Sequence, residues 1–121
     1  LKEMIVFVVS AKNGANYCSA CHAQAVLSLD KTLTFEGLQT YLQGNSTLRL
    51  PIYYRSVVQF AAKVAEDCKG LQDSDFDALM AQGFSTEEIC EIVSVIDLAT
   101  MFNVYTSTLK LDLDPQYRAI L

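Results

Sequence analysis

The residues best suited to chemistry lie close together in one short segment, Cys18-Ser19-Ala20-Cys21-His22. On a helix, Cys18 and His22 stand four residues apart and face the same side. A neighbouring imidazolium and a helix N-terminus both favour the thiolate form of a cysteine. We therefore expect Cys18 to be a nucleophile activated by His22. Cys21 is then a candidate resolving cysteine that forms a disulfide with oxidised Cys18.

The same segment also has a structural interpretation and a metal-binding one. Free cysteine is among the most often buried residues, and His22 could be a hydrogen-bonded histidine of the core. A zinc site needs four ligands, whereas Cys18, Cys21 and His22 supply three, and neither remaining cysteine has a paired spacing. We therefore expect no metal and no other bound cofactor.

The segment further spells C-x-x-C-H, the motif by which c-type haem is attached covalently. A c-type haem electron carrier needs a second axial ligand, which in a chain with one histidine would be a methionine. The three methionines lie in apolar or helical stretches, at Met4, Met80 and Met101. Haem attachment also requires export to an oxidising compartment, and the start of the sequence is a poor signal peptide. The haem carrier is the alternative from another functional class.

The composition restricts the class of protein and its partners. With 121 residues, the chain is expected to form a single domain over residues 1–121, and since it does not begin with Met it could lack an N-terminal helix. A net charge of −5 argues against a nucleic-acid partner or an anionic membrane partner. The longest apolar run, residues 4–9, is too short to span a bilayer. The four cysteines lack the loop-rich surroundings of a disulfide framework, which favours a reducing, cytoplasmic location.

These residues must be positioned by helices, because apolar periodicity and turn signals predict an all-α bundle without strands. Thr34 and Ser85 are expected N-caps, and Ser74 with Asp77 resembles a capping box. Pro115 marks the start of an irregular tail. Helices are expected over approximately residues 16–29, 34–41, 51–68, 74–83 and 86–109. Residues 2–11 are nearly continuously apolar, and periodicity alone does not assign them to a buried helix or a buried strand.

The last of these helices, over residues 86–109, is apolar almost all round and leaves no wide polar face. Such a helix is expected at the centre of the molecule. The chain as a whole is 51% hydrophobic, which is high for a small domain with much surface to cover. We therefore expect a homo-oligomer in which apolar surface is buried between subunits.

Residues 9–22 read VSAKNGANYCSACH and follow Glu3 at the spacing of a known pattern. That pattern, a Glu followed by V-S-x-x-N-x-C-x-Y-C-x-x-x-H, is typical of the alkylhydroperoxidase-D-like, carboxymuconolactone decarboxylase family, which the chain therefore resembles. Residues 60–64, 75–79, 81–89 and 102–103 are similar to the second half of that family. The resemblance implies an AhpD-like helical bundle, in which residues 2–11 form a helix, and an assembly into a trimer or hexamer.

The resemblance also implies roles for individual residues. Cys18 corresponds to the second cysteine of the family, which attacks peroxide, and His22 with Glu3 corresponds to its proton relay. The implied activity is that of a thiol-dependent peroxidase, which reduces hydroperoxides with electrons from a thiol or dithiol such as a lipoyl-type carrier. The first cysteine of the family, which resolves the sulfenic acid, is Ala15 here. Either Cys21 or an external thiol has taken over that role, or peroxidase activity is lost, or the alanine is an introduced replacement.

Some members of the family do not depend on the cysteine pair. A carboxymuconolactone-decarboxylase-type lyase would use His22 and Glu3 as general acid and base on a carboxylated lactone. A catalytically silent oligomer is the remaining alternative. The presence of Cys18 in register with Glu3 and His22 favours the peroxidase.

Overall fold

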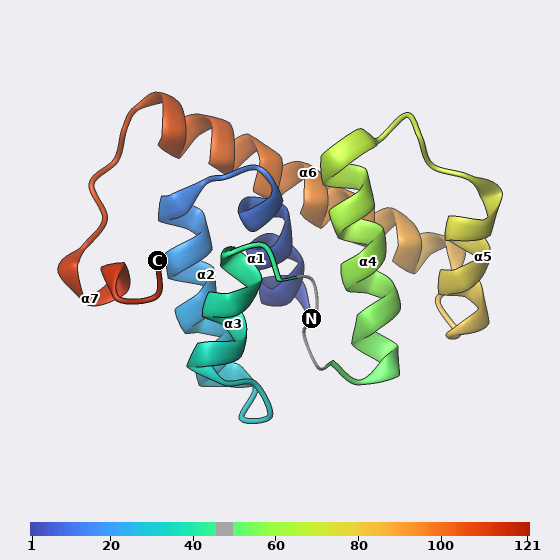
Figure 1. Cartoon of the computed structure of the whole chain (residues 1–121). Coiled ribbons are helices and arrows are strands. Elements are labelled where there is room, and N and C mark those ends of the chain that lie inside the picture. The colour runs from blue at the N-terminus through green and yellow to red at the C-terminus, as the bar shows by residue number, and fades with distance from the viewer. Residues whose placement is uncertain (46–49) are drawn as a thin grey trace.

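The structure is a computed structural model that describes residues 1–45 and 50–121, without the side chain of Tyr53 (Figure 1). Its described residues form helices and no strands, so the predicted all-α class is confirmed. The helices are α1 (Lys2–Lys12), α2 (Asn16–Leu29), α3 (Phe35–Leu42), α4 (Ile52–Asp67), α5 (Asp73–Ala81), α6 (Thr86–Thr108) and α7 (Pro115–Arg118).

The central helix is α1, which packs against α2, α4 and α6. Every residue from Met4 to Ser10 is buried. Phe7 lies in a core cluster with residues of α2 and α3, whereas Val9 lies in a second cluster with residues of α4, α5 and α6. Because both sides of α1 are covered by other helices, its apolar run needs no polar stripe.

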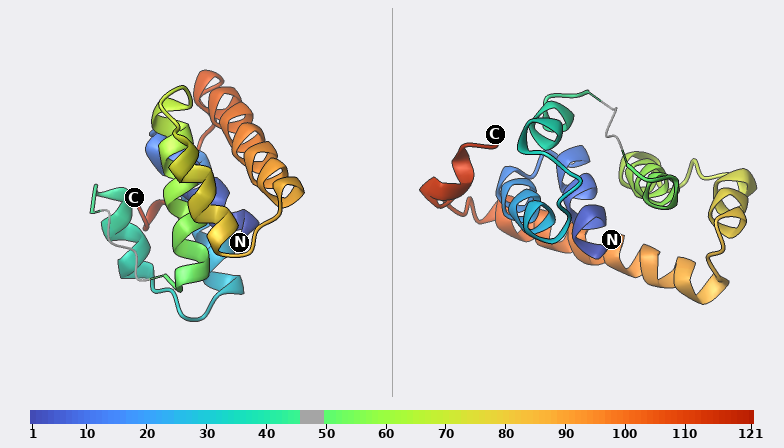
Figure 2. Two further views of the ribbon diagram at one scale, coloured as in Figure 1. Left: turned by 90° about the vertical axis from the view of Figure 1, so that its right-hand side faces the viewer. Right: turned by 90° about the horizontal axis from the view of Figure 1, so that it is seen from below.

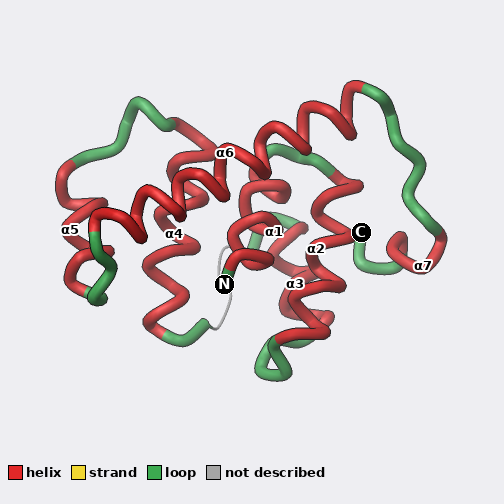
Figure 3. The backbone as a smooth tube through the Cα atoms, turned by 180° about the vertical axis from the view of Figure 1, so that it is seen from behind, coloured by secondary structure: helices red, strands yellow, loops and turns green. Residues whose placement is uncertain are grey.

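Contrary to the expectation from its composition, α6 lies along one side of the molecule and not at its centre (Figures 2 and 3). Its buried side chains form a single stripe with helical spacing: Ile89, Ile92, Ile96, Ala99, Asn103 and Thr106. Apolar side chains outside the stripe, such as Val104 and Tyr105, are each 62% exposed. Composition shows that a helix has two apolar faces, but not which of them finds a partner within its own chain.

By length and composition alone, α6 is also apolar enough to cross a membrane, and the expectation based on uninterrupted apolar runs missed this. A third of that apolar window (33%) is buried inside the fold. Helices in the core of soluble proteins pass the same test, and α6 contacts α1, α2, α4 and α5 as such a helix does.

The helix ends follow the capping signals in most places. Thr34 accepts a hydrogen bond from the Gly37 amide, and Ser85 forms a capping box with Glu88, as expected. The box predicted at Ser74 and Asp77 is wrong, because Gln72 and Asp75 form it two residues earlier.

The predicted irregular tail is also wrong in part. Pro115 opens the short helix α7, since a proline suits the first position of a helix. Beyond α7, Ile120 is fully buried in the core cluster that contains Phe7. The burial of Ile120 holds the C-terminal segment against the other helices (Figure 1).

Candidate active site

The candidate site is built where α1, α2 and α6 meet. The turn between α1 and α2 is short, and Gly14 adopts a left-handed φ of 65° that L side chains rarely reach. The amide of Ala15 donates to the carbonyl of Ser10, which closes the turn at 2.9 Å. The two helices therefore run antiparallel, and the start of α1 lies opposite the middle of α2.

This antiparallel packing brings Glu3 and His22 together. The Nδ1 atom of His22 lies 2.6 Å from Oε2 of Glu3. A carboxylate can only accept, so Nδ1 carries the proton, and Nε2 of the neutral ring is left free to act as a base. Both side chains are partly exposed, at 29% for His22 and 38% for Glu3. The pair is thus a preoriented acid/base dyad that solvent can reach.

Cys18 lies in the first turn of α2, at the third helical position after the N-cap residue Ala15. This position receives the favourable field of the helix N-terminus, as the sequence suggested. Its side chain is only 4% exposed. The Sγ atom contacts Oγ1 of Thr106, at 3.4 Å. Among the described residues no hydrogen bond joins Cys18 to His22, although their Cα atoms are separated by one helical turn, a rise of about 6 Å.

Sequence reasoning missed the contribution of α6 to this site. Besides Thr106, α6 places Asn103 against α1, where Oγ of Ser10 donates to its Oδ1 at 2.8 Å. All three polar side chains are buried, and Nδ2 of Asn103 has no hydrogen-bond partner among the described residues. Their signal in the sequence is the position of Asn103 and Thr106 on the otherwise apolar buried stripe of α6.

Cys21 lies one turn further along α2 than Cys18 and is only partly exposed. Burial is the main cause that raises the pKa of its thiol, and the nearby Cys18 adds to the effect. Less of Cys21 is therefore thiolate at neutral pH than in an ordinary cysteine, which weakens it as a resolving nucleophile. Ala15, where the family has its first cysteine, is buried at the N-cap.

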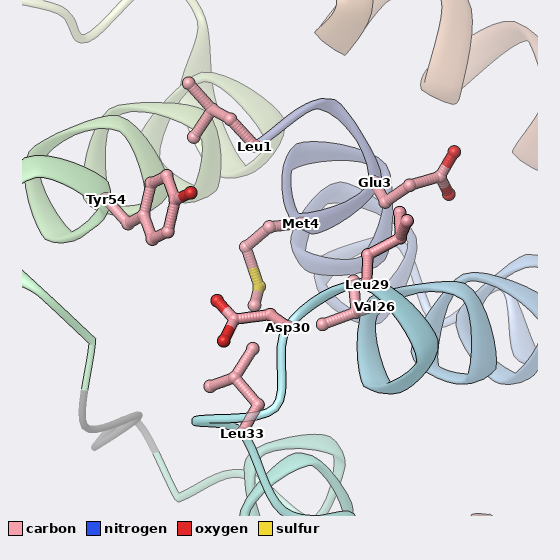
Figure 4. Close-up of a pocket in the computed structure, with 8 residues that line it drawn as sticks. All are labelled: Leu1, Glu3, Met4, Val26, Leu29, Asp30, Leu33 and Tyr54. Atoms are coloured by element: carbon pink, nitrogen blue, oxygen red, sulfur yellow. The ribbon is translucent and has the colours of Figure 1, made fainter.

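A pocket of about 410 Å³ opens on the other side of Glu3 (Figure 4). Most of its lining is apolar, with two carboxylates and one phenol: Leu1, Glu3, Met4, Val26, Leu29, Asp30, Leu33 and Tyr54. In Figure 4 the carboxylate of Glu3 points away from Met4 and Tyr54, in keeping with its bond to His22. The pocket is therefore beside the dyad and not beside Cys18.

The other two cysteines are exposed free thiols: Cys68 is the C-cap of α4, and Cys90 lies in the first part of α6. Within the described residues, no group of three or more His, Cys, Asp or Glu side chains is arranged to hold a metal ion.

No protein-family model and no curated protein matches the chain. Solved structures do match it. An uncharacterized peroxidase-related protein from Silicibacter sp. TM1040 superposes with a TM-score of 0.82 at 28% identity, over 96% of this chain and 60% of the other. The alkylhydroperoxidase AhpD core, an uncharacterized peroxidase-related protein from Ralstonia eutropha JMP134, gives 0.81 at 24% identity over the same shares.

The chain therefore has the AhpD-like fold that its sequence pattern predicted. It spans about 60% of the length of these two AhpD-like proteins. A cysteine-to-alanine variant of the debrominase Bmp8, in complex with 2,3,4-tribromopyrrole, superposes with a TM-score of 0.78 at 18% identity, over 98% of this chain and 62% of the other. That likeness establishes a shared fold and no more. The fold therefore serves proteins named for different reactions, and the function of this AhpD-like chain has to be argued from its own site.

Proposed function

We propose that this AhpD-like chain is a thiol-dependent peroxidase that reduces hydroperoxides through Cys18. The observation that carries the proposal is the placement of Cys18 in the first turn of α2, one turn before a histidine that is oriented by a carboxylate. A thiol becomes nucleophilic when a base takes its proton and positive charge stabilises the thiolate; the neighbouring imidazole can act as that base, and the helix N-terminus supplies positive charge. The 28% identical neighbour named as peroxidase-related supports the same class of reaction.

In the proposed reaction, the proton of the Cys18 thiol passes to Nε2 of His22. Because no direct hydrogen bond joins the two residues, the transfer runs through one water molecule. The thiolate sulfur then attacks the distal oxygen of the hydroperoxide, so that an S–O bond forms and the O–O bond breaks. The alkoxide leaves with the proton returned by His22 as an alcohol, and Cys18 becomes a sulfenic acid. Glu3 keeps the ring in the correct tautomer throughout.

The catalytic cycle closes with two thiols from outside the chain. The first attacks the sulfenic sulfur, forms a mixed disulfide and releases water; the second displaces Cys18 as thiol and leaves the reductant as a disulfide. This route replaces the family's internal first cysteine, since Ala15 has no thiol and the raised pKa of Cys21 disfavours its attack. A small dithiol such as a lipoyl-type carrier supplies both electrons. A cytoplasmic location, where such reductants are held reduced, completes the proposal.

The experiment is steady-state consumption of hydrogen peroxide and of an alkyl hydroperoxide with a dithiol donor. Cys18→Ser should abolish consumption, whereas Cys68→Ser, which removes an exposed thiol that makes no contact with Cys18 among the described residues, should leave it unchanged. His22→Gln should slow it by about 10²-fold or more, the usual contribution of a positioned acid/base group. Equal activity of the Cys18→Ser variant and the parent would refute the proposal.

One observation favours a second candidate. Glu3, the partner of His22, lines the pocket of about 410 Å³, so an acid/base pair stands at the edge of a space that can hold an organic substrate. A carboxymuconolactone-decarboxylase-type lyase would need His22 and Glu3 but not Cys18. Loss of a lactone decarboxylase activity in His22→Gln, with full activity in Cys18→Ser, would establish it over the peroxidase.

A further inference from the structure

Among the described residues, the sulfur of Cys18 has one hydrogen-bond partner, Thr106, which lies near the other end of the chain. Oγ1 of Thr106 lies 3.4 Å from Sγ, across 88 positions of sequence. Cys18 and Thr106 are 4% and 8% exposed, so bulk water does not compete for the contact. In such surroundings an ionised sulfur depends on the hydrogen-bond donors that the protein provides.

The hydroxyl of Thr106 has two partners but only one proton to donate. Besides Sγ of Cys18, it lies 3.5 Å from the carbonyl oxygen of Asn103, one turn earlier in α6. When Cys18 is a thiol, its S–H can donate to Oγ1 while the hydroxyl donates to that carbonyl. When Cys18 is a thiolate, the hydroxyl can rotate and donate to the sulfur instead. Hydrogen bonds to an ionised acceptor are stronger than neutral ones, so the second arrangement favours the thiolate.

We propose that Thr106 is the positioning residue of the nucleophile: its hydroxyl holds the Cys18 sulfur in place and stabilises the thiolate by a hydrogen bond from α6. The proposal rests on the proposed function in one respect, since it assigns Thr106 to the Cys18 chemistry described there. It extends the site from two helices to three and gives α6 a direct part in it.

A second contact keeps Thr106 in register. The bond between Ser10 and Asn103 is fully enclosed and joins α1 to α6 one turn away from Thr106. Because a buried side-chain bond of this kind is made in only one register, α6 cannot rotate or slide without breaking it. Two polar contacts thus join α6 to α1 and α2: Ser10 bonds to Asn103, and the Cys18 sulfur contacts Thr106.

Other charges also act on Cys18 and must be kept constant in a test. Tyr17 and Cys21 lie on the same helix and are electrostatically coupled to Cys18, while Asp114 in the segment before α7 is coupled to both of them. His22 lies one turn further along α2 and carries its own partner, Glu3. Thr106 is uncharged, so replacing it alters none of these groups.

The experiment is an NMR titration of the full chain in which Cys18 is the single cysteine, with the other three replaced by serine. Cysteine labelled with ¹³C at Cβ reports its own ionisation, and the measurement needs no reagent to reach the buried sulfur. Thr106→Val keeps the shape of the side chain but loses the donor. The midpoint of the titration should then move upward by about one pH unit, the scale of a charge-assisted hydrogen bond. Thr106→Ser restores a hydroxyl and should titrate within a few tenths of a pH unit of the parent.

Thr106→Ala gives the same test if the valine variant fails to fold, because it also lacks the hydroxyl and adds no bulk. A midpoint that is unchanged in both the valine and alanine variants overturns the proposal, as does a serine variant that titrates like valine. Peroxide consumption by the parent chain is measured separately. If the parent shows no turnover but the titration shifts as expected, Thr106 remains the positioning residue and the peroxidase proposal is wrong. If the parent turns over peroxide but the titration does not shift, the peroxidase proposal stands and the role of Thr106 is wrong.

Discussion

Ala15→Cys is the most informative gain-of-function substitution, because it returns a thiol to the position where the family has its first cysteine. Residue 15 is the N-cap of α2, three residues before Cys18, with φ −86° and ψ 85° outside the helical region. A disulfide requires Cα atoms about 4.4 to 6.8 Å apart and Cβ atoms that face each other. The non-helical N-cap can adjust to meet this requirement, whereas Cys21 is held within the regular helix.

The size of the effect follows from the short loop that the new bridge would close. An internal thiol on a short connection competes at an effective concentration of mM or more. With external dithiol at about 0.1 mM, the resolving step should therefore accelerate by about tenfold or more. The bridge closes a loop of about four residues, which in the chain-entropy treatment stabilises the oxidised form by about 2 kcal/mol. Ala15 is only 2% exposed, so the added sulfur costs about 1–3 kcal/mol of packing in the reduced form.

The assay is peroxide turnover at low dithiol, together with the mass of the tryptic peptide that contains residues 15 and 18. The matched control is Ser19→Cys, which also adds a thiol at a buried position near Cys18 but on a neighbouring residue that faces away. Turnover should rise in Ala15→Cys and stay at the parent level in the control. Equal turnover in all three proteins, or an equal rise in both variants, would refute the geometric argument.

Three further predictions follow from other parts of the structure. Cys21→Ser should leave dithiol-supported turnover within about twofold of the parent, because a raised pKa and a regular helix both oppose its attack on Cys18; loss of turnover would instead make Cys21 the resolving cysteine. Val104→Glu, in the exposed apolar face of α6, should shift the sedimentation coefficient toward that of a monomer, whereas Ile52→Glu, equally exposed on α4, should not; a parent that is already monomeric would refute self-association. The backbone amide of Gln72 and the ammonium of Lys63 lower the pKa of Asp75, so its contribution to stability is present above about pH 4 and is lost as pH falls through its lower folded value. Asp75→Asn should accordingly lower the melting temperature at neutral pH and lower it less at about pH 3, as measured by circular dichroism; an equal decrease at both pH values would contradict this sign.

Much of the fold could be predicted from the sequence because its signals are local. Turn residues, N-caps and apolar periodicity predicted the ends of α2 and α6 almost to the residue, whereas α1 was predicted to be a helix only from the family resemblance. The capping box of α5 was misplaced because Ser74 is a better N-cap by residue type than Gln72, whereas the fold begins the helix at Asp73. The tail was misjudged because a single buried residue, Ile120, fixes it through contacts distant in sequence.

The candidate site could also be predicted from the sequence only in part. The pattern of residues 3 to 22 predicts that Glu3 and His22 act together, and their 2.6 Å contact agrees with this. The Thr106 contact could not be found by spacing, because it joins residues 88 positions apart through the packing of α6. The burial of each cysteine could not be predicted from spacing either: Cys18 is buried, while Cys68 and Cys90 are exposed.

This contrast makes one measurement decisive for the central claim that Cys18 is the peroxide-reactive thiol. The reduced parent chain is treated with one equivalent of hydrogen peroxide, and the reaction is quenched within seconds. The oxygen added to each cysteine-containing peptide is then measured by mass spectrometry. If accessibility controlled oxidation, the exposed Cys68 and Cys90 would react first. We predict that Cys18 is oxidised first, by at least about tenfold over either exposed thiol, because reactivity follows thiolate stabilisation at the helix N-terminus beside His22. Oxidation of Cys68 or Cys90 ahead of Cys18 would contradict it.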